Sequence, residues 1–211
     1  MEGSVKRRRT RIQTEKRDVI LEAALDVFSA HGFRGATIDQ IAEAAGMSKP
    51  NLLYYFRGKE DIHETLIKRL LDTWLAPLRE MDETGDPITE IRSYIRRKLE
   101  MARDFPRESR LFANEILQGA PRVMPMLEGE LKPLVDEKAA VIKDWIKQGK
   151  LARIDPWHLI FSIWATTQHY ADFDVQVRAV LGPDRGGEGR FDDAARLLEQ
   201  LYLDGLRPKA G

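Results

Sequence analysis

Hydrophobic residues recur every three or four positions along most of the chain, which is the spacing of one face of an α-helix. The first run covers about residues 14–31 and stops at Gly32, a residue that commonly ends helices. Similar runs predict helices at about 87–104, 107–118, 121–149, 156–181 and 191–206. The stretch GPDRGGEGR, 182–190, should be a mobile loop, since four glycines and several charges leave little to bury. No useful stretch alternates as a strand would, so we predict an all-α protein of about nine helices.

Two short helices are expected after the first one. Thr37 and Gln40 have the spacing of a capping box, in which each side chain bonds the backbone of the other, and the helix they begin should end at Gly46. Ser48 can cap the next helix, and Pro50 suits its first turn because the amide that proline lacks would have no intrahelical partner there. Two short helices joined by a glycine turn predict a helix-turn-helix, whose second helix enters a major groove of DNA.

The second of these short helices should have an inward and an outward face. The expected inward residues are Leu52, Tyr55 and Phe56. Lys49, Asn51 and Tyr54 then project outward. Lysine can bind a phosphate, asparagine can pair with an adenine edge, and a tyrosine hydroxyl can bond a phosphate while its ring packs on a sugar or a thymine methyl. The pattern therefore predicts a DNA-reading face, with Tyr55 at its edge.

The candidate DNA-binding residues include neighbours of this face. The full set is Thr37, Ser48, Lys49, Asn51, Leu52, Tyr54, Tyr55 and Lys59. The alternative is an ordinary helical hairpin, because many hairpins fit this spacing by chance and tyrosines are often half-buried at the rim of a core.

Charge changes the balance between these two interpretations. The 211-residue chain has a formal net charge of zero, but residues 1–17 hold seven Lys and Arg against two Glu, a net charge of +5 that leaves −5 for the rest. A basic arm ahead of a folded domain is typical of nucleic-acid binding, because lysine and arginine displace counterions from phosphates. The alternative is a solvated tail that aids solubility. We expect a basic disordered arm at residues 1–14.

Composition excludes several classes of protein. The absence of cysteine excludes disulfides, thiolate metal sites and cysteine nucleophiles. No apolar run approaches the roughly 18 residues of a membrane span, and no secretory leader is present, so we expect a bacterial protein of the cytoplasm, at the nucleoid when bound to DNA. The four histidines have no metal-ligand spacing, and there is no glycine-rich phosphate loop. We expect neither an enzyme nor a metal or cofactor site.

The sequence of residues 20–62, ILEAALDVFSAHGFRGATIDQIAEAAGMSKPNLLYYFRGKEDI, is similar throughout to the TetR family of bacterial transcriptional regulators. In that family, a three-helix DNA-binding domain precedes a helical domain that binds a ligand and dimerises. The resemblance implies a DNA-binding domain at residues 15–60 and a ligand-binding and dimerisation domain at 61–211.

Later segments resemble, more particularly, the regulators of pyrimidine utilisation within this family. They include SRLFANEILQGAP at 109–121 and IWATTQHYADF at 163–173. This likeness implies a homodimeric repressor that binds a palindromic operator in double-stranded DNA and is released by uracil or thymine. One alternative is a member of the same family that senses a different planar or apolar ligand. Another is a helical interaction protein whose arm binds acidic partners or an anionic membrane.

A longer helix is expected after Gly58, through Trp74 to Pro77 or just past it, as a connector between the domains. Gly58 departs from the family, which often has a capping serine or asparagine at this place. Trp74 is a candidate ligand-binding residue, because a ligand touching it could bias the angle of the connector. The alternative for Trp74 is ordinary core.

The helix that follows Asp155 is apolar nearly all round and must be buried on more than one side. Trp157, Phe161, Trp164 and Gln168 share one face of it. A buried amide left unpaired costs roughly 1–3 kcal/mol, and a pyrimidine offers Gln168 a matching donor and acceptor. Spacing alone favours a backbone partner or a dimer contact for Gln168, whereas the resemblance favours Trp164 and Gln168 as ligand-binding residues.

Two more candidates lie on the helix that begins near residue 107. Phe112 and Glu115 are one turn apart there, and Glu115 could accept a proton from a ring nitrogen of the ligand. The alternative is a surface pair between Glu115 and Arg110. His169, beside Gln168, is more often structural than catalytic in such a setting.

Overall fold

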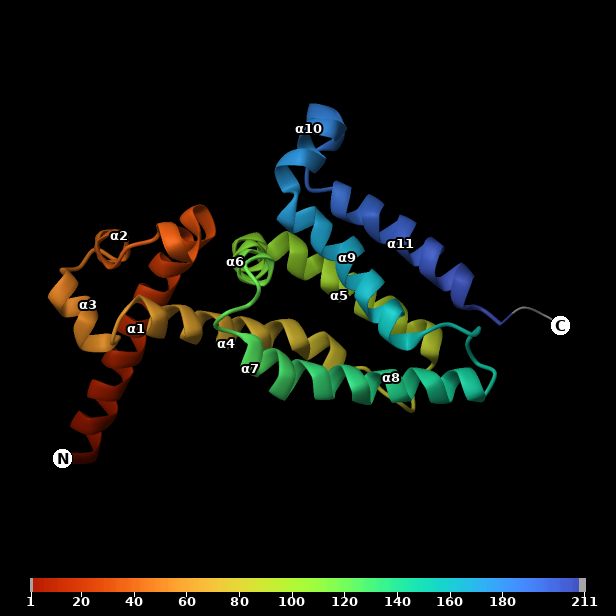
Figure 1. Cartoon of the computed structure of the whole chain (residues 1–211), viewed down its shortest axis with the longest axis horizontal. Helices are drawn as coiled ribbons and strands as arrows, with labels where there is room; N and C mark the ends of the chain where they lie inside the picture. Colours follow the sequence, from red (N-terminus) through yellow and green to blue (C-terminus); the bar gives the residue numbers. More distant parts are fainter. Residues whose placement is uncertain (1, 209–211) are drawn as a thin grey trace. The chain divides into compact units, whose positions relative to one another are not determined.

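The computed structural model describes residues 2–208, with side chains from residue 11 onwards. Within these residues the secondary structure is helical throughout (Figure 1). The elements are α1 (Glu2–Gly35), α2 (Ile38–Ala44), α3 (Lys49–Tyr55), α4 (Lys59–Arg79), α5 (Pro87–Asp104), α6 (Pro106–Leu117), α7 (Met124–Met126), the π-helix η1 (Leu127–Leu131), α8 (Lys132–Lys147), α9 (Pro156–Asp172), α10 (Asp174–Arg185) and α11 (Arg190–Leu206). The predicted all-α class is confirmed.

The chain forms two compact units. The first contains the residues up to Leu71 together with Arg110–Val123, and the second contains Asp72–Ser109 and the residues from Met124 on. The sequence placed a domain boundary at residues 60 and 61, whereas the first unit also includes half of α4 and most of α6. Helices α4 and α6 therefore each pass from one unit into the other along the chain.

The first unit is a small helical domain whose core comes from one face of each helix. Ile20 and Phe28 of α1, Ile41 of α2, Leu52 of α3 and Ile62 of α4 are completely buried. The predicted order of a long helix, two short helices and a connector is observed.

The beginning of α1 differs from the expected arm. Helix α1 begins at Glu2, so the structure continues the first helix through residues 2–14. Arg11 there pairs with Glu15 at 3.0 Å. The basic side chains at positions 6–9 lie outside the described residues.

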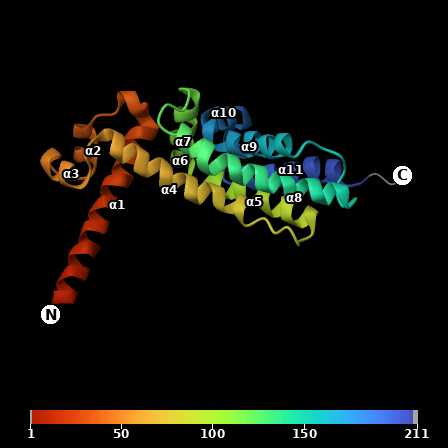
Figure 2. The ribbon, with the colours of Figure 1, turned by 60° about the horizontal axis from the view of Figure 1, so that its bottom comes forward.

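The second unit is a helical bundle built around α5. Helix α5 packs against both α9 and α11, and α8 packs against α9 (Figure 2). The interior is apolar, with Ile95 of α5, Trp145 of α8 and Ile163 of α9 at most 2% exposed. The indole N–H of Trp145 donates to the carbonyl of Glu83 at 3.1 Å, which satisfies the polar atom of this buried ring.

Two predicted helices are divided in the structure. The expected helix at 121–149 is split into α7, η1 and α8. Its first part contains Pro125, Gly129 and Pro133, which disfavour an uninterrupted helix. The expected helix at 156–181 ends at Asp172, and Phe173, with φ −113° and ψ 27°, separates α9 from α10.

The stretch at 182–190 buries more than the sequence indicated. Residues up to Arg185 complete α10, with a break at Gly182, where φ is 70°. Arg190 is only 7% exposed, and its guanidinium donates to the Gly187 carbonyl at 2.9 Å and to Asp174 Oδ1 at 2.6 Å. The segment is tied to the start of α10 by this arginine. Among the described residues, no helix has both the length and the apolar composition needed to cross a bilayer.

Candidate functional site

Helix α3 is short, and its position is fixed by a cap and two buried anchors. The Ser48 hydroxyl accepts the backbone N–H of Asn51 at 3.4 Å and so caps the helix. Leu52 is completely buried and Phe56 is 2% exposed. These contacts hold a helix of seven residues that would not be stable alone.

The opposite face of α3 is exposed. Tyr54 is 72% exposed, and Lys49 and Asn51 are exposed beside it. The half-buried Tyr55 ring meets the Tyr54 ring edge-on, with 5.1 Å between the ring centres. The predicted division of α3 into a buried and an exposed face is therefore observed, and its exposed face carries an ammonium, an amide and a phenol.

Three other candidates have roles inside the domain. Thr37 and Gln40 form the predicted capping box, in which the Thr37 N–H donates to Gln40 Oε1 at 2.8 Å and the Gln40 N–H donates to Thr37 Oγ1 at 3.2 Å. The Lys59 ammonium donates to the carbonyls of Phe33 and Ala36, both at 2.8 Å, and thereby holds the end of α1. Leu52, being buried, anchors α3 and does not belong to the exposed face.

The start of α4 is capped without a serine or asparagine at Gly58. Asp61, in the first turn, accepts the backbone N–H of Arg57 at 2.9 Å. A carboxylate at this place also suits the positive end of the helix dipole.

Sequence reasoning missed Arg17 as an anchor of α3. Its guanidinium lies 4.0 Å from the centre of the Phe56 ring, and Nη1 donates to the carbonyl of Tyr55 at 2.5 Å. Arg17 had been counted only as part of the basic segment. No local pattern could reveal this contact, because the partners are 38 positions apart in sequence.

Glu115 lies in the first unit, in a buried polar cluster. Its carboxylate accepts the backbone N–H of Arg122 at 2.9 Å and the Arg122 guanidinium at 3.2 Å. The guanidinium also lies 3.4 Å from the centre of the Phe33 ring. The described partner of Glu115 is therefore Arg122, in place of the Arg110 considered from the sequence. Phe112, one turn earlier on α6, is half-buried.

His63 completes this cluster. Its Nε2 is 3.7 Å from Glu115 Oε2, and its ring meets the rings of Phe28 and Phe33 edge-on. Burial among these rings lowers the pKa of His63 to about 4, although Glu115 opposes this effect. His63 is therefore neutral at pH 7. Among the described residues, its Nδ1 has no hydrogen-bond partner.

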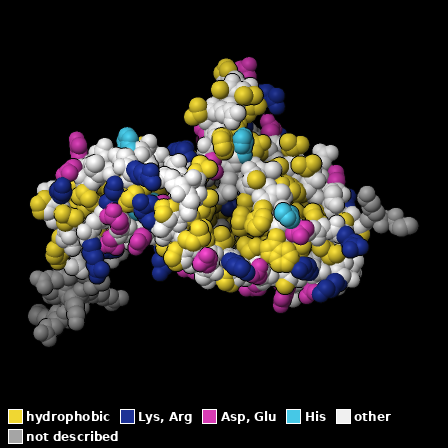
Figure 3. Space-filling model, in the orientation of Figure 1, with side chains coloured by type: hydrophobic (Ala, Val, Ile, Leu, Met, Phe, Trp, Pro, Cys, Tyr) yellow, Lys and Arg dark blue, Asp and Glu magenta, His cyan; other side chains and the backbone are white. Residues whose placement is uncertain are grey.

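A cavity of about 320 Å³ lies in the second unit beside α9. Trp157, Phe161 and Trp164 line it, so three of the four residues predicted to share a face of this helix do meet at one surface. Its other lining residues are Leu127, Leu131, Lys132, Val135 and Asp136. Figure 3 shows hydrophobic side chains gathered over α8 and α9. The volume and the apolar lining suit a small organic ligand.

Trp164 also contacts the interior of the bundle. Its indole N–H donates to the hydroxyl of Tyr94 at 2.5 Å. Gln168, one turn further along α9, is half-buried and does not line the cavity. Trp74 is 6% exposed, and the ammonium of Lys98 lies 4.3 Å from the centre of its ring. Trp74, Trp164 and Gln168 thus lie in the second unit, and Phe112 and Glu115 in the first.

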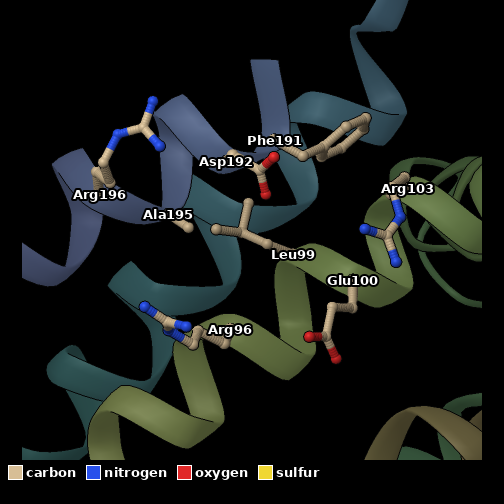
Figure 4. A pocket seen from close by; sticks show the side chains of 8 residues that line it. All are labelled: Arg96, Leu99, Glu100, Arg103, Phe191, Asp192, Ala195 and Arg196. Atoms are coloured by element: carbon tan, nitrogen blue, oxygen red, sulfur yellow. The ribbon is translucent and has the colours of Figure 1, made fainter. Parts of the chain in front are cut away.

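A second cavity, of about 240 Å³, lies between α5 and α11 (Figure 4). Its lining residues are Arg96, Leu99, Glu100, Arg103, Phe191, Asp192, Ala195 and Arg196. Its three arginines are already paired, with Glu199, Asp104 and Asp193 respectively. The charge needed to hold an anionic ligand is therefore largely neutralised. Within the described residues, no cluster of His, Asp or Glu could hold a metal ion.

Two family models together match nearly the whole chain. The model described as bacterial regulatory proteins, tetR family, matches residues 20–66, and the model described as YcdC-like protein, C-terminal region, matches residues 67–209. The chain is also 50% identical to the HTH-type transcriptional regulator RutR of Escherichia coli (strain K12) over 210 residues, 99% of each chain. The chain belongs to the TetR family. It is a DNA-binding transcriptional regulator similar to RutR and not an enzyme.

Solved structures of the TetR family share this fold. The ketosteroid transcriptional regulator KstR2 of Mycobacterium tuberculosis superposes with a TM-score of 0.72 at 22% identity, over 90% of this chain and 94% of that one. A putative fatty acid metabolism regulator of Clostridium perfringens gives a TM-score of 0.69 at 22% identity, over 89% and 97%. TetR regulators bind DNA and small-molecule effectors and act as dimers. The match to the DNA-binding model contains all of α2 and α3.

Proposed function

We propose that this TetR-family regulator binds a palindromic operator as a homodimer, is released from it by uracil or thymine, and controls pyrimidine catabolism. The exposed face of the anchored helix α3 is the observation that carries the DNA-binding part of this proposal. Lys49, Asn51 and Tyr54 offer contacts to phosphates and base edges, while Leu52 and Phe56 keep the helix in place. Thr37, Ser48 and Tyr55 contribute backbone or edge contacts to the same groove.

The pyrimidine part of the proposal is supported by Trp164, Gln168 and the resemblance to regulators of pyrimidine utilisation. The ring of Trp164 offers a flat apolar surface, and the amide of Gln168 offers a donor and an acceptor one turn away. The cavity of about 320 Å³ beside Trp164 gives a small molecule access to this part of the bundle.

The dimeric part of the proposal is supported by an apolar surface on α11. Leu197 is 58% exposed and Leu201 is 61% exposed, one turn apart on the same face. Phe161 of α9 is 47% exposed. Helices α9 and α11 would pack against their copies as a four-helix bundle. The two copies of α3 would then enter successive major grooves about 34–36 Å apart.

Release from DNA requires a difference in effector affinity between two states of the dimer. The pyrimidine must bind more tightly to the state in which the spacing of the two α3 helices fits the operator badly. A ligand with equal affinity for both states would leave DNA binding unchanged.

A mobility-shift titration with operator DNA, without and with uracil or thymine, tests the proposal. We expect a specific complex in the ligand-free protein and its loss on addition of either base. Calorimetric titration of the protein with both bases and a purine provides the direct binding measurement. An absence of heat from uracil and thymine would remove the pyrimidine assignment and leave a TetR regulator of another ligand. The largely apolar lining of the cavity near Trp164 favours an apolar molecule in that case.

A further inference from the structure

The second unit contains a buried lysine that the DNA-binding and dimerisation surfaces do not explain. Lys98 projects from α5 and is 3% exposed, although lysine is almost never this buried unless it is paired. Its ammonium lies 4.3 Å from the centre of the Trp74 ring. Among the described residues, the structure records no hydrogen bond from this ammonium, which has three N–H donors.

A buried ammonium without acceptors is energetically unfavourable. Burial lowers the pKa of Lys98 to about 7, and only the carboxylate of Asp172 opposes this effect. The ring of Trp74 offers the ammonium a cation–π contact but no lone pair. An unsatisfied buried donor of this kind calls for a partner that the protein chain alone does not provide, such as an acceptor atom of a bound molecule.

The surroundings of Lys98 combine flat rings with polar groups. Tyr94 lies one turn earlier on α5, and its hydroxyl accepts the indole N–H of Trp164 on α9. Gln168 and Asp172 follow Trp164 at intervals of one turn on the same face of α9. All of these residues belong to one compact unit, in which α5 packs along α9.

Asp172 is held in a defined position beside this face. The Ser109 hydroxyl of α6 donates a short hydrogen bond to Asp172 Oδ1. A carboxylate has about four lone-pair sites, so Asp172 keeps the capacity to accept a further hydrogen bond.

We propose that Lys98 and Asp172 determine the specificity of the effector site, Lys98 by donating a hydrogen bond to a ring carbonyl of the pyrimidine and Asp172 by accepting one from the neighbouring ring N–H. This inference rests on the proposed function, because it assigns residues to the same effector site as Trp164 and Gln168. It extends that site to an ammonium and a carboxylate that the sequence pattern did not single out.

The charges define the class of ligand. One cation and one carboxylate sum to zero, so the site suits a neutral molecule, and Asp172 disfavours an anion. The ligand must present a carbonyl next to an N–H on a flat ring, as uracil and thymine do. The compound 2,4-diaminopyrimidine keeps the ring but replaces both carbonyl acceptors with amino donors, so it should not bind. The Trp74 ring face occupied by the ammonium supports Lys98, which leaves Trp164 as the stacking surface.

Lys98→Met tests the inference, because methionine keeps most of the volume of the side chain and removes the ammonium. The matched control is Lys143→Met, since the Lys143 ammonium also lies over a tryptophan, 4.1 Å from the centre of the Trp157 ring, but Lys143 is exposed. Calorimetric titration with uracil should show affinity weakened roughly 10- to 100-fold by Lys98→Met, the range typical of a lost hydrogen bond to a charged group, and unchanged by Lys143→Met. Operator binding without ligand should be equal in all three proteins.

The outcomes separate this inference from the proposed function. Uracil affinity in Lys98→Met equal to that of the wild type overturns the role of Lys98, even if the protein remains a pyrimidine-responsive regulator. Absence of uracil and thymine binding in the wild type overturns the proposed function itself. Tight binding of 2,4-diaminopyrimidine by the wild type overturns the assigned ligand class. If Lys98→Met does not fold, Lys98→Gln decides, because it keeps one donor without the charge and should retain intermediate affinity; unchanged affinity in that variant would equally overturn the role.

Discussion

The ammonium of Lys49 on α3 lies 2.9 Å from Asp39 Oδ2 on α2. Both side chains are at least half exposed, so this pair contributes little to stability. Its consequence is for DNA binding, because the lysine that should contact a phosphate is held by a carboxylate in the ligand-free protein.

We expect Asp39→Asn to increase affinity for any DNA sequence by about two- to fivefold, since an exposed ion pair is worth at most about 1 kcal/mol. The substitution frees Lys49 and removes a negative charge that would face the phosphates. Fluorescence anisotropy with operator and unrelated duplexes measures the effect. Asp144→Asn is the control, because Asp144 is likewise an exposed partner of a lysine, Lys147 at 2.9 Å, but belongs to the other unit. Unchanged or weaker binding by Asp39→Asn would contradict the assigned role of Lys49.

Lys49→Ala and Asn51→Ala should differ in kind. Loss of the lysine removes a phosphate contact, so binding should weaken on all sequences and the salt dependence should decrease by about one unit of slope. Loss of the asparagine removes a contact to a base edge, so discrimination at one operator position should decrease by roughly 1–3 kcal/mol. Binding measured over several salt concentrations and single-base operator variants separates these effects. If neither substitution alters binding, the exposed face of α3 does not read DNA.

Leu52→Ala should destabilise the DNA-binding unit by about 2–5 kcal/mol, because it leaves a cavity under α3. Its neighbour Leu53 is 41% exposed and provides the control, and Leu53→Ala should remain within about 0.5 kcal/mol of the wild type. Urea unfolding followed by circular dichroism measures both. Equal midpoints for the two variants would show that Leu52 does not anchor α3.

The buried His63 predicts a dependence of stability on pH. Its folded-state pKa of about 4 lies below the ordinary value of 6.5, so between these values the unfolded state binds more protons than the folded state. The free energy of unfolding should therefore decrease as the pH falls from about 6.5 towards 4, and this loss should be smaller in His63→Gln. His31 is exposed on α1, and His31→Gln serves as the control. Identical pH profiles for the wild type and His63→Gln would refute the contribution of His63.

The sequence predicted best the features that depend on neighbouring residues. The capping box of Thr37 and Gln40, the cap at Ser48 and the start of α9 after Asp155 are all observed, because a cap is decided within one helical turn. The break between α9 and α10 was missed, since neither proline nor glycine marks Phe173.

Features that depend on distant residues were not accessible from a local pattern. The pairing of Glu115 with Arg122 beside His63 places part of α6 in the first unit, and nothing near Glu115 indicates this. Lys98 was overlooked for a related reason, because a lysine in an amphipathic helix is normally on its solvated face. The DNA-reading face was predictable because its inward and outward residues alternate within the seven residues of α3.

The small size of α3 also bears on how such a regulator can change during evolution. The residues that hold this helix, Ser48, Leu52 and Phe56, are different from those that it presents to solvent. Exchanging Lys49, Asn51 or Tyr54 therefore leaves the scaffold intact, so descendants of this protein can acquire new target genes through single substitutions without a penalty in folding.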